Sequence, residues 1–223
     1  MTPRSLFKCA NEGETLRAQQ IAEKYQFDSV PLLQKGAIRK YWSREDKKVV
    51  QISGKHRILH DTPIEVAVSR LAAHMIQFVH YRTEIVGIID LSDLNKPVAR
   101  LTWLRPLLEC EQAIVMRSEE QGFTEERIRA ALGRAAKDAQ QFKERAAQRD
   151  LLMPLLGFAH FRDILKVAVA LGFIELSEHD ILRLNRIRNR SAHIGQPLIE
   201  KNNDIEDLIW ALGACQQVLR QIG

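Results

Sequence analysis

The pattern of apolar residues changes once along this chain of 223 residues, near residue 96, and this change limits what the chain can fold into. Before it, short apolar runs typical of strands alternate with short segments of helical spacing. After it, apolar residues recur at helical spacing almost to the C-terminus. The length suits one large domain or two modest ones, and the change of pattern favours two. We therefore predict an α+β fold, with an N-terminal α/β domain at 1–96 and a C-terminal all-α helical bundle at 97–223.

The first half repeats one order of elements. A helix is predicted at 14–25, followed by strands at 29–33 and 37–42 and a charged loop at 43–48. A second helix is predicted at 64–74, followed by strands at 75–80 and 85–89. Helix, strand, turn and strand therefore occur twice, which indicates an internal repeat.

The end of the second copy carries a short motif, Gly87-Ile88-Ile89 followed by Asp93. This motif resembles that of CBS domains, in which a Gly and two apolar residues precede a hydroxyl residue and, three positions later, an Asp. Asp90 stands where the hydroxyl residue is expected. The resemblance of the repeat to a CBS pair implies binding of an adenine nucleotide, with Asp93 on the ribose. The competing interpretation makes Asp93 a helix N-cap, because a helix is predicted to begin near Lys96.

The second half is predicted to hold five helices, at 98–117, 124–152, 158–171, 177–193 and 205–222. Short connections between consecutive helices favour an antiparallel bundle. The fourth helix is the most informative. Ser177 is placed to cap its start, and Gly195 and Pro197 follow its end as stop signals.

Arg188, Asn189 and His193 lie near the end of that fourth helix. A guanidinium can neutralise charge on a phosphate, and an imidazole can move a proton near neutral pH. The competing interpretation is that cations simply suit the negative end of a helix dipole. The pattern Arg, polar residue, three variable residues, His resembles the signature of HEPN domains, and the predicted bundle resembles their architecture.

The HEPN resemblance implies metal-independent endoribonuclease activity at a site formed where two subunits meet. His193 would transfer a proton, Arg188 would stabilise the transition state, and Asn189 would hold the imidazole or donate to phosphate. Cleavage would leave a 2′,3′-cyclic phosphate and a 5′-hydroxyl. A role as a toxin or in defence, with a protein antitoxin as partner, fits this family. The alternatives are a non-catalytic adenine-nucleotide sensor, a dimerisation module, or RNA binding without cleavage.

Helical geometry adds an argument for a homodimer. A rotation of about 100° per residue places Arg188 and His193 roughly 140° apart, so one regular helix cannot aim both at one phosphate. A two-fold axis beside this helix would bring two copies of each residue into one cleft. Three further arginines of this helix, Arg183, Arg186 and Arg190, are predicted to form a basic rim for RNA phosphates, or else a solvated face.

Composition and net charge are consistent with the ribonuclease hypothesis and exclude few other functions. The net charge of +5 permits a polyanion partner such as RNA. No apolar run approaches the roughly 18 residues of a membrane span, so we expect no membrane partner. Three widely separated cysteines are typical of reduced thiols in a cytoplasmic protein. The histidines and cysteines form no ligand pattern, so we expect neither a metal nor a required cofactor.

Overall fold

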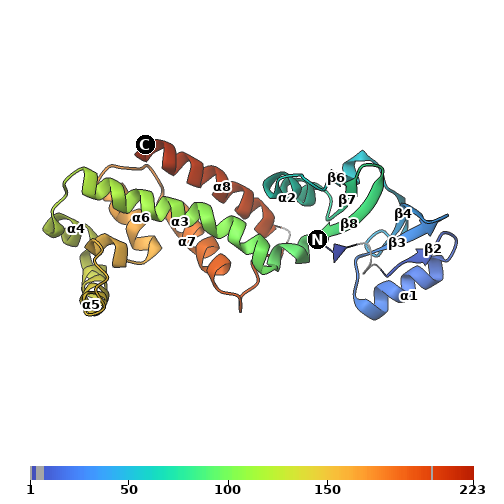
Figure 1. Ribbon diagram of the computed structural model, residues 1–223, viewed down its shortest axis with the longest axis horizontal. Helices are drawn as coiled ribbons and strands as arrows, with labels where there is room; N and C mark the ends of the chain where they lie inside the picture. The colour runs from blue at the N-terminus through green and yellow to red at the C-terminus, as the bar shows by residue number, and fades with distance from the viewer. Residues whose placement is uncertain (1, 4–7, 202) are drawn as a thin grey trace. The chain divides into compact units, whose positions relative to one another are not determined.

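The computed structural model describes residues 2–3, 8–201 and 203–223. The chain is a mixed α+β protein that divides into two compact units, Met1–Lys96 and Pro97–Gly223 (Figure 1). The first unit contains both sheets, and the second unit is helical. The α+β class expected from the change in apolar pattern is therefore confirmed.

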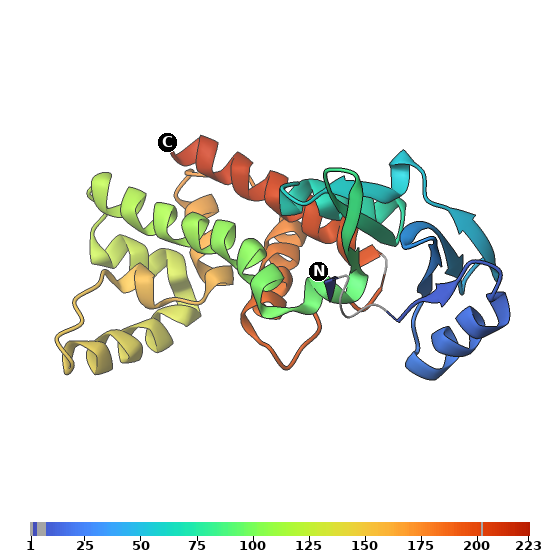
Figure 2. The ribbon, with the colours of Figure 1, turned by 45° about the vertical axis from the view of Figure 1, so that its right-hand side comes forward.

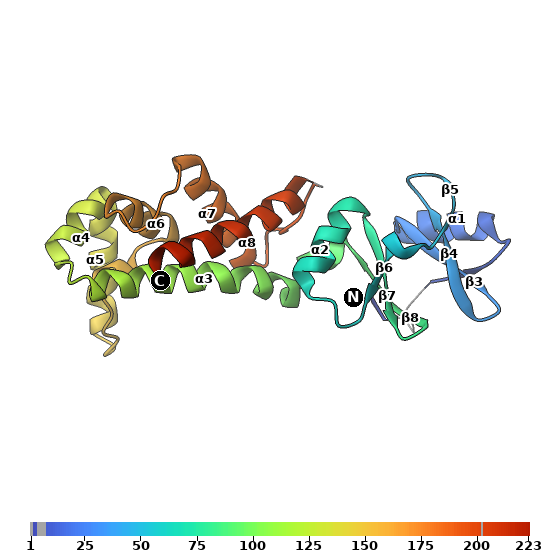
Figure 3. The ribbon, with the colours of Figure 1, turned by 90° about the horizontal axis from the view of Figure 1, so that it is seen from above.

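The N-terminal unit contains the same order of elements twice (Figure 3). The first copy consists of β2 (Ala10–Asn11), α1 (Thr15–Tyr25), β3 (Ser29–Gln34) and β4 (Ala37–Ser43). The second consists of β6 (Arg57–Leu59), α2 (Ile64–Ala73), β7 (Ile76–Tyr81) and β8 (Glu84–Asp90). In each copy the first strand pairs parallel with the second, and the second pairs antiparallel with the third. The repeat is thus a repeat of topology and of pairing direction.

Each copy gains a fourth strand at its edge. β5 (Lys48–Gln51) pairs antiparallel with β4, and β1 (Thr2–Pro3) pairs antiparallel with β8. The two sheets have the orders β2-β3-β4-β5 and β1-β8-β7-β6. Strands β2, β5 and β6 were not predicted, because runs of two to four residues are too short to show a period of two.

The first hairpin depends on backbone conformations that few residues adopt. Lys35 and Gly36 connect β3 to β4 with φ angles of 49° and 78°. Two consecutive positive φ angles are those of a type I′ turn, whose twist matches that of the paired strands. A register shift follows Leu32 in this hairpin, and one follows Val79 in the second hairpin. The two copies therefore share an irregularity as well as a topology.

Three clusters of buried apolar side chains hold this unit together. One lies beneath α1 and includes Ala18, Ala22 and Trp42. Another lies beneath α2 around Ala67 and Val79. The third joins the two copies, because it contains residues of both sheets: Ile38, Tyr41, Ile52, Ile76, Phe78 and Ile85.

The C-terminal unit is built around one long helix, α3 (Pro97–Glu120), which packs against α6, α7 and α8 (Figure 2). The other helices are α4 (Glu125–Leu132), α5 (Ala136–Ala147), α6 (Phe161–Ala170), α7 (Glu178–Ala192) and α8 (Asn203–Ile222). Fully buried side chains of α3, such as Trp103, Leu107 and Ile114, lie in this core. Cys110 and Cys215 are buried there as thiols.

The single long helix predicted at 124–152 is wrong. The chain breaks at Gly133, which has φ 56° and ψ −121° and ends α4. That conformation favours glycine over any residue with a Cβ atom. A short 3-10 helix, Gly133–Ala135, then leads into α5, which ends at Ala147. The Ala-rich, charged sequence favours a continuous helix, so the break at this one glycine was not predicted.

Candidate functional site

Helix α7 has a defined start and end. The Asp180 backbone N–H donates to Ser177 Oγ at 3.1 Å, which caps the first turn as expected. The helix ends at Ala192, and His193 has φ −103° and ψ 107°, so its backbone is extended. The His193 N–H still donates to the Asn189 carbonyl at 3.0 Å. His193 is therefore held one turn beyond Asn189 while its side chain is exposed.

A buried arginine holds the carbonyl end of α7. Arg100 of α3 is only 4% exposed, and its guanidinium donates to the carbonyl oxygens of Arg190 at 2.5 Å and His193 at 3.0 Å. It also donates to the carbonyl of Gln196. The last carbonyls of a helix lack partners within the helix and carry partial negative charge, so a buried cation stabilises them. Sequence reasoning missed Arg100, because nothing near it in the sequence marks it as distinct.

Arg188 lines a pocket of about 220 Å³ between α7 and the start of α6. The lining residues are Ala159, His160, Phe161, Arg162, Asp163, Asn185, Arg188 and Asn189. The structure thus brings together Arg188 and Asn189, two of the three residues of the motif. His193 is not among the lining residues. The pocket also contains polar residues of α6 that sequence reasoning did not single out.

Glu111 of α3 forms an ion pair with Arg188 and partly balances its charge. The distance from Arg188 Nη2 to Glu111 Oε2 is 3.9 Å, which is an ion pair without a hydrogen bond. Burial raises the pKa of Glu111, and the opposing effect of Arg188 is smaller. Within residues 2–3, 8–201 and 203–223, no acceptor reaches the buried Nε of Arg188. The Arg188 side chain is 29% exposed and lines the pocket, so a ligand there could contact its positive charge.

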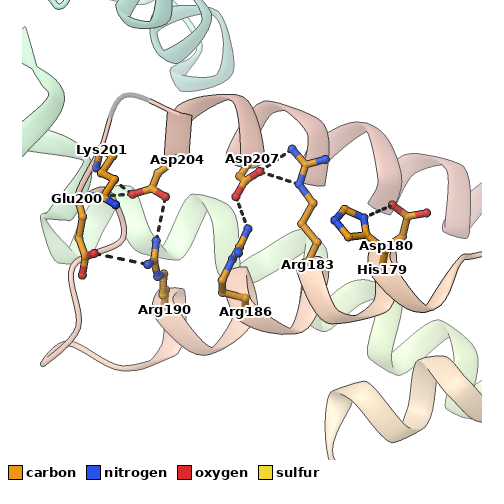
Figure 4. Close-up of polar contacts among 9 residues, drawn as sticks. All are labelled: His179, Asp180, Arg183, Arg186, Arg190, Glu200, Lys201, Asp204 and Asp207. Carbon is orange, nitrogen blue, oxygen red and sulfur yellow. Dashed lines mark hydrogen bonds and ion pairs between the residues drawn. The ribbon is translucent and has the colours of Figure 1, made fainter.

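The three arginines predicted as a basic rim are ion-paired with α8 (Figure 4). Arg183 Nε donates to Asp207 Oδ1 at 2.7 Å, and Arg186 binds the other oxygen of the same carboxylate. Arg190 lies 3.1 Å from Asp204. These pairs form a ladder between α7 and α8, which we call the α7–α8 ladder.

The ladder lies between two helices that are distant in sequence, so the carboxylates of α8 were not foreseen. Their signal was present as Asp204 and Asp207, three residues apart on one face of a helix. Arg183 also stacks on the Trp210 ring at 4.1 Å. An arginine has five N–H donors, so pairing with a carboxylate does not use all of them. A role of these arginines in contacting RNA stays a prediction.

Asp93 belongs to a capping box. The Asp90 backbone N–H donates to Asp93 Oδ2 at 3.2 Å, and Asp90 Oδ1 accepts from the Ser92 and Asp93 backbone N–H groups. Asp93 is buried, and Lys96 pairs with it. Asp90, where a hydroxyl residue was expected, is thus the cap of the short 3-10 helix Leu91–Asn95.

The N-terminal unit has a cleft of about 990 Å³. Its lining includes the aromatic side chains of Tyr25, Phe27 and Tyr41, and the polar residues Asp90 and Ser92. Asp93 is not among the lining residues. Such a combination of aromatic and polar groups can hold a small molecule with a planar ring.

Comparisons of the chain with models of protein families, with curated proteins and with solved structures found no match. Within the described residues, no three His, Cys, Asp or Glu side chains gather in a way that could hold a metal ion. In that same part of the chain, no helix combines the length and apolar character needed to cross a membrane.

Proposed function

We propose that the C-terminal bundle is a metal-independent endoribonuclease of the HEPN type, with Arg188, Asn189 and His193 as its catalytic residues. One observation carries the proposal: Arg188 and Asn189 line a polar pocket, and α7 ends so that His193 is exposed one turn beyond Asn189. One chain therefore offers a cation and an amide in the pocket and an exposed imidazole beyond the helix end.

The proposed reaction uses the RNA's own 2′-hydroxyl as nucleophile. His193 transfers a proton, either from the 2′-hydroxyl or to the leaving 5′-oxygen. Such acid–base catalysis raises the reaction rate roughly 10²–10⁴-fold. Arg188 stabilises the extra negative charge that develops on the phosphate oxygens. Asn189 donates to phosphate or holds the imidazole. The products are a 2′,3′-cyclic phosphate and a 5′-hydroxyl.

We further propose that the active form is a homodimer. The pocket of one chain contains Arg188 but not His193. A second copy related by a two-fold axis beside α7 would supply His193 to that pocket, and would do so twice by symmetry. We include in this proposal a role as a toxin or in defence, in which a protein antitoxin blocks the cleft between the two copies of α7.

The N-terminal unit supports a second candidate function, an adenine-nucleotide sensor of the CBS type that regulates the bundle or acts without catalysis. The observation that favours it is the cleft of about 990 Å³ with aromatic lining in a unit built from two copies of one motif. Calorimetric titration with ATP, AMP and cyclic nucleotides tests it. Binding heat with a raised melting temperature is expected, and the absence of both would contradict it.

The ribonuclease proposal is tested by incubating the purified full chain with single-stranded RNA in excess EDTA and analysing the ends of the products. We expect cleavage with 2′,3′-cyclic phosphate and 5′-hydroxyl ends. Intact RNA would contradict the proposal in favour of RNA binding or dimerisation. Products with 3′-hydroxyl and 5′-phosphate ends would contradict the mechanism.

A further inference from the structure

The pocket that contains Arg188 has an imidazole of its own. His160 precedes the first turn of α6 and lines the pocket from the wall opposite α7. It is exposed, and its side chain makes no capping hydrogen bond to α6. The edge of its ring faces Phe142 at a centroid distance of 6.4 Å. His160 is therefore the N-cap of α6 through its backbone carbonyl, while its ring contacts Phe142 and makes no capping bond.

The other lining groups suit a phosphate. Arg162 and Arg188 bring two positive charges to the pocket. Asp163 lies 3.5 Å from Arg162 Nε, and Glu111 pairs with Arg188 from outside the lining. The N-terminus of α6, a helix of 10 residues, carries partial positive charge and favours an anion, and the Asp163 and Ile164 N–H groups there already donate to the His160 carbonyl. Asn185 and Asn189 add amide donors. These groups together make an anion site out of two helices.

The size of the pocket agrees with this assignment. Its volume is about 220 Å³. A phosphate with part of its sugar fits such a volume, whereas a folded RNA helix does not. The pocket therefore suits a phosphate group of an RNA strand with part of its sugar.

We propose that this pocket holds the scissile phosphate and that His160 is the second proton-transferring residue of the reaction; the inference rests on the proposed ribonuclease function. In the step, the 2′-oxygen forms a bond to phosphorus and the bond from phosphorus to the 5′-oxygen breaks. One imidazole takes the proton of the 2′-hydroxyl, and the other, already protonated, gives a proton to the 5′-oxygen. Exchange with water restores both. His160 and His193 divide these two transfers between them.

The test is the dependence of kcat/KM on pH for the wild-type chain and the His160→Ala variant, with RNA in EDTA. We expect a bell-shaped profile for the wild type. The variant should lose roughly 10²–10⁴-fold in rate and one limb of the bell. Its melting temperature should not change, because the side chain is exposed. His179→Ala removes an equally exposed imidazole outside the pocket and should retain the wild-type profile.

An independent measurement separates the failure of this inference from that of the proposed function. Titration with inorganic phosphate, followed by NMR of the histidine ring protons, should shift the signals of His160 and leave those of His179 unchanged. Arg188→Lys should weaken the phosphate effect. If the wild type cuts RNA and His160→Ala cuts equally fast, the inference is wrong and the proposed function stands. If the wild type cuts no RNA, the proposed function and the catalytic role of His160 both fail, and the phosphate titration alone decides whether the pocket is an anion site.

Discussion

At the scale of single residues, Glu111 is a buried carboxyl group whose ionisation affects the proposed site through Arg188. It lies behind Arg188, and burial raises its pKa above the ordinary value for a carboxyl group. A carboxyl group with a raised pKa in the folded state stabilises the fold below its unfolded pKa. That contribution is lost as pH rises through the folded pKa. Glu111 therefore pairs with Arg188, and its ionisation lowers the free energy of unfolding near neutral pH.

Replacing Glu111 by Gln should remove this dependence. The melting temperature of Glu111→Gln, relative to the wild type, should rise as pH increases from about 4.5 to 8, because only the wild type must ionise a buried carboxyl group. Differential scanning calorimetry across this range measures the difference. Glu109→Gln, at a more exposed carboxylate of the same helix, serves as the control. A difference that stays constant with pH would contradict the assignment.

At this scale, the sequence could predict those site residues that lie close together along the chain. Arg188, Asn189 and His193 were visible because they lie within one short segment. His160 and Arg100 were not, because they reach the same region only through the packing of α6 and α3 on α7. A pocket with walls from separate helices leaves no local pattern in the sequence.

At the scale of elements, two sets of contacts determine where α7 lies and where it ends. The α7–α8 ladder joins the sides of two helices, and Arg100 binds the carbonyl end of α7. Together they place His193, which follows that end directly. The helices themselves were predictable from their apolar spacing, whereas the break at Gly133 and the short strands were not. A single glycine and runs of two to four residues carry too little pattern.

Arg100→Met should destabilise the bundle strongly. It leaves three carbonyl groups without their charged donor, and one hydrogen bond to a charged group contributes about 1.5–3 kcal/mol. We expect a clear fall in melting temperature. RNA cleavage should also fall at temperatures where the variant is still folded, since His193 loses its support. Arg105→Met, on the exposed face of the same helix, should change neither property.

Asp207→Asn tests the ladder. The carboxylate binds Arg183 and Arg186 and is only 21% exposed, so its loss should lower stability by about 1–2 kcal/mol. Chemical denaturation of the full chain measures this change. Glu206→Gln, at an exposed neighbouring position, should stay within about 0.5 kcal/mol of the wild type. Equal stabilities of the two variants would show that the ladder contributes little.

At the scale of the whole molecule, the proposed site belongs to a pair of chains. If His193 of one copy acts with Arg188 of the other, a mixture of inactive Arg188→Ala and inactive His193→Ala chains should regain activity. Random exchange gives half mixed dimers, each with one intact site of two, so about a quarter of wild-type activity is expected. Cleavage assays after subunit exchange measure it. A mixture as inactive as its components would place the site within one chain.

The most direct test of the account is RNA cleavage in EDTA by the wild type, Arg188→Ala and His193→Ala, each with its melting temperature. Because Arg188→Ala leaves Glu111 without its partner, Arg188→Ala/Glu111→Gln accompanies it. Arg117→Ala, a half-buried arginine outside the pocket, is the matched control. We predict cleavage by the wild type and the control. The other three variants should be folded at the assay temperature and should cleave RNA at least a hundredfold more slowly. Wild-type cleavage by folded Arg188→Ala/Glu111→Gln or His193→Ala would contradict the account.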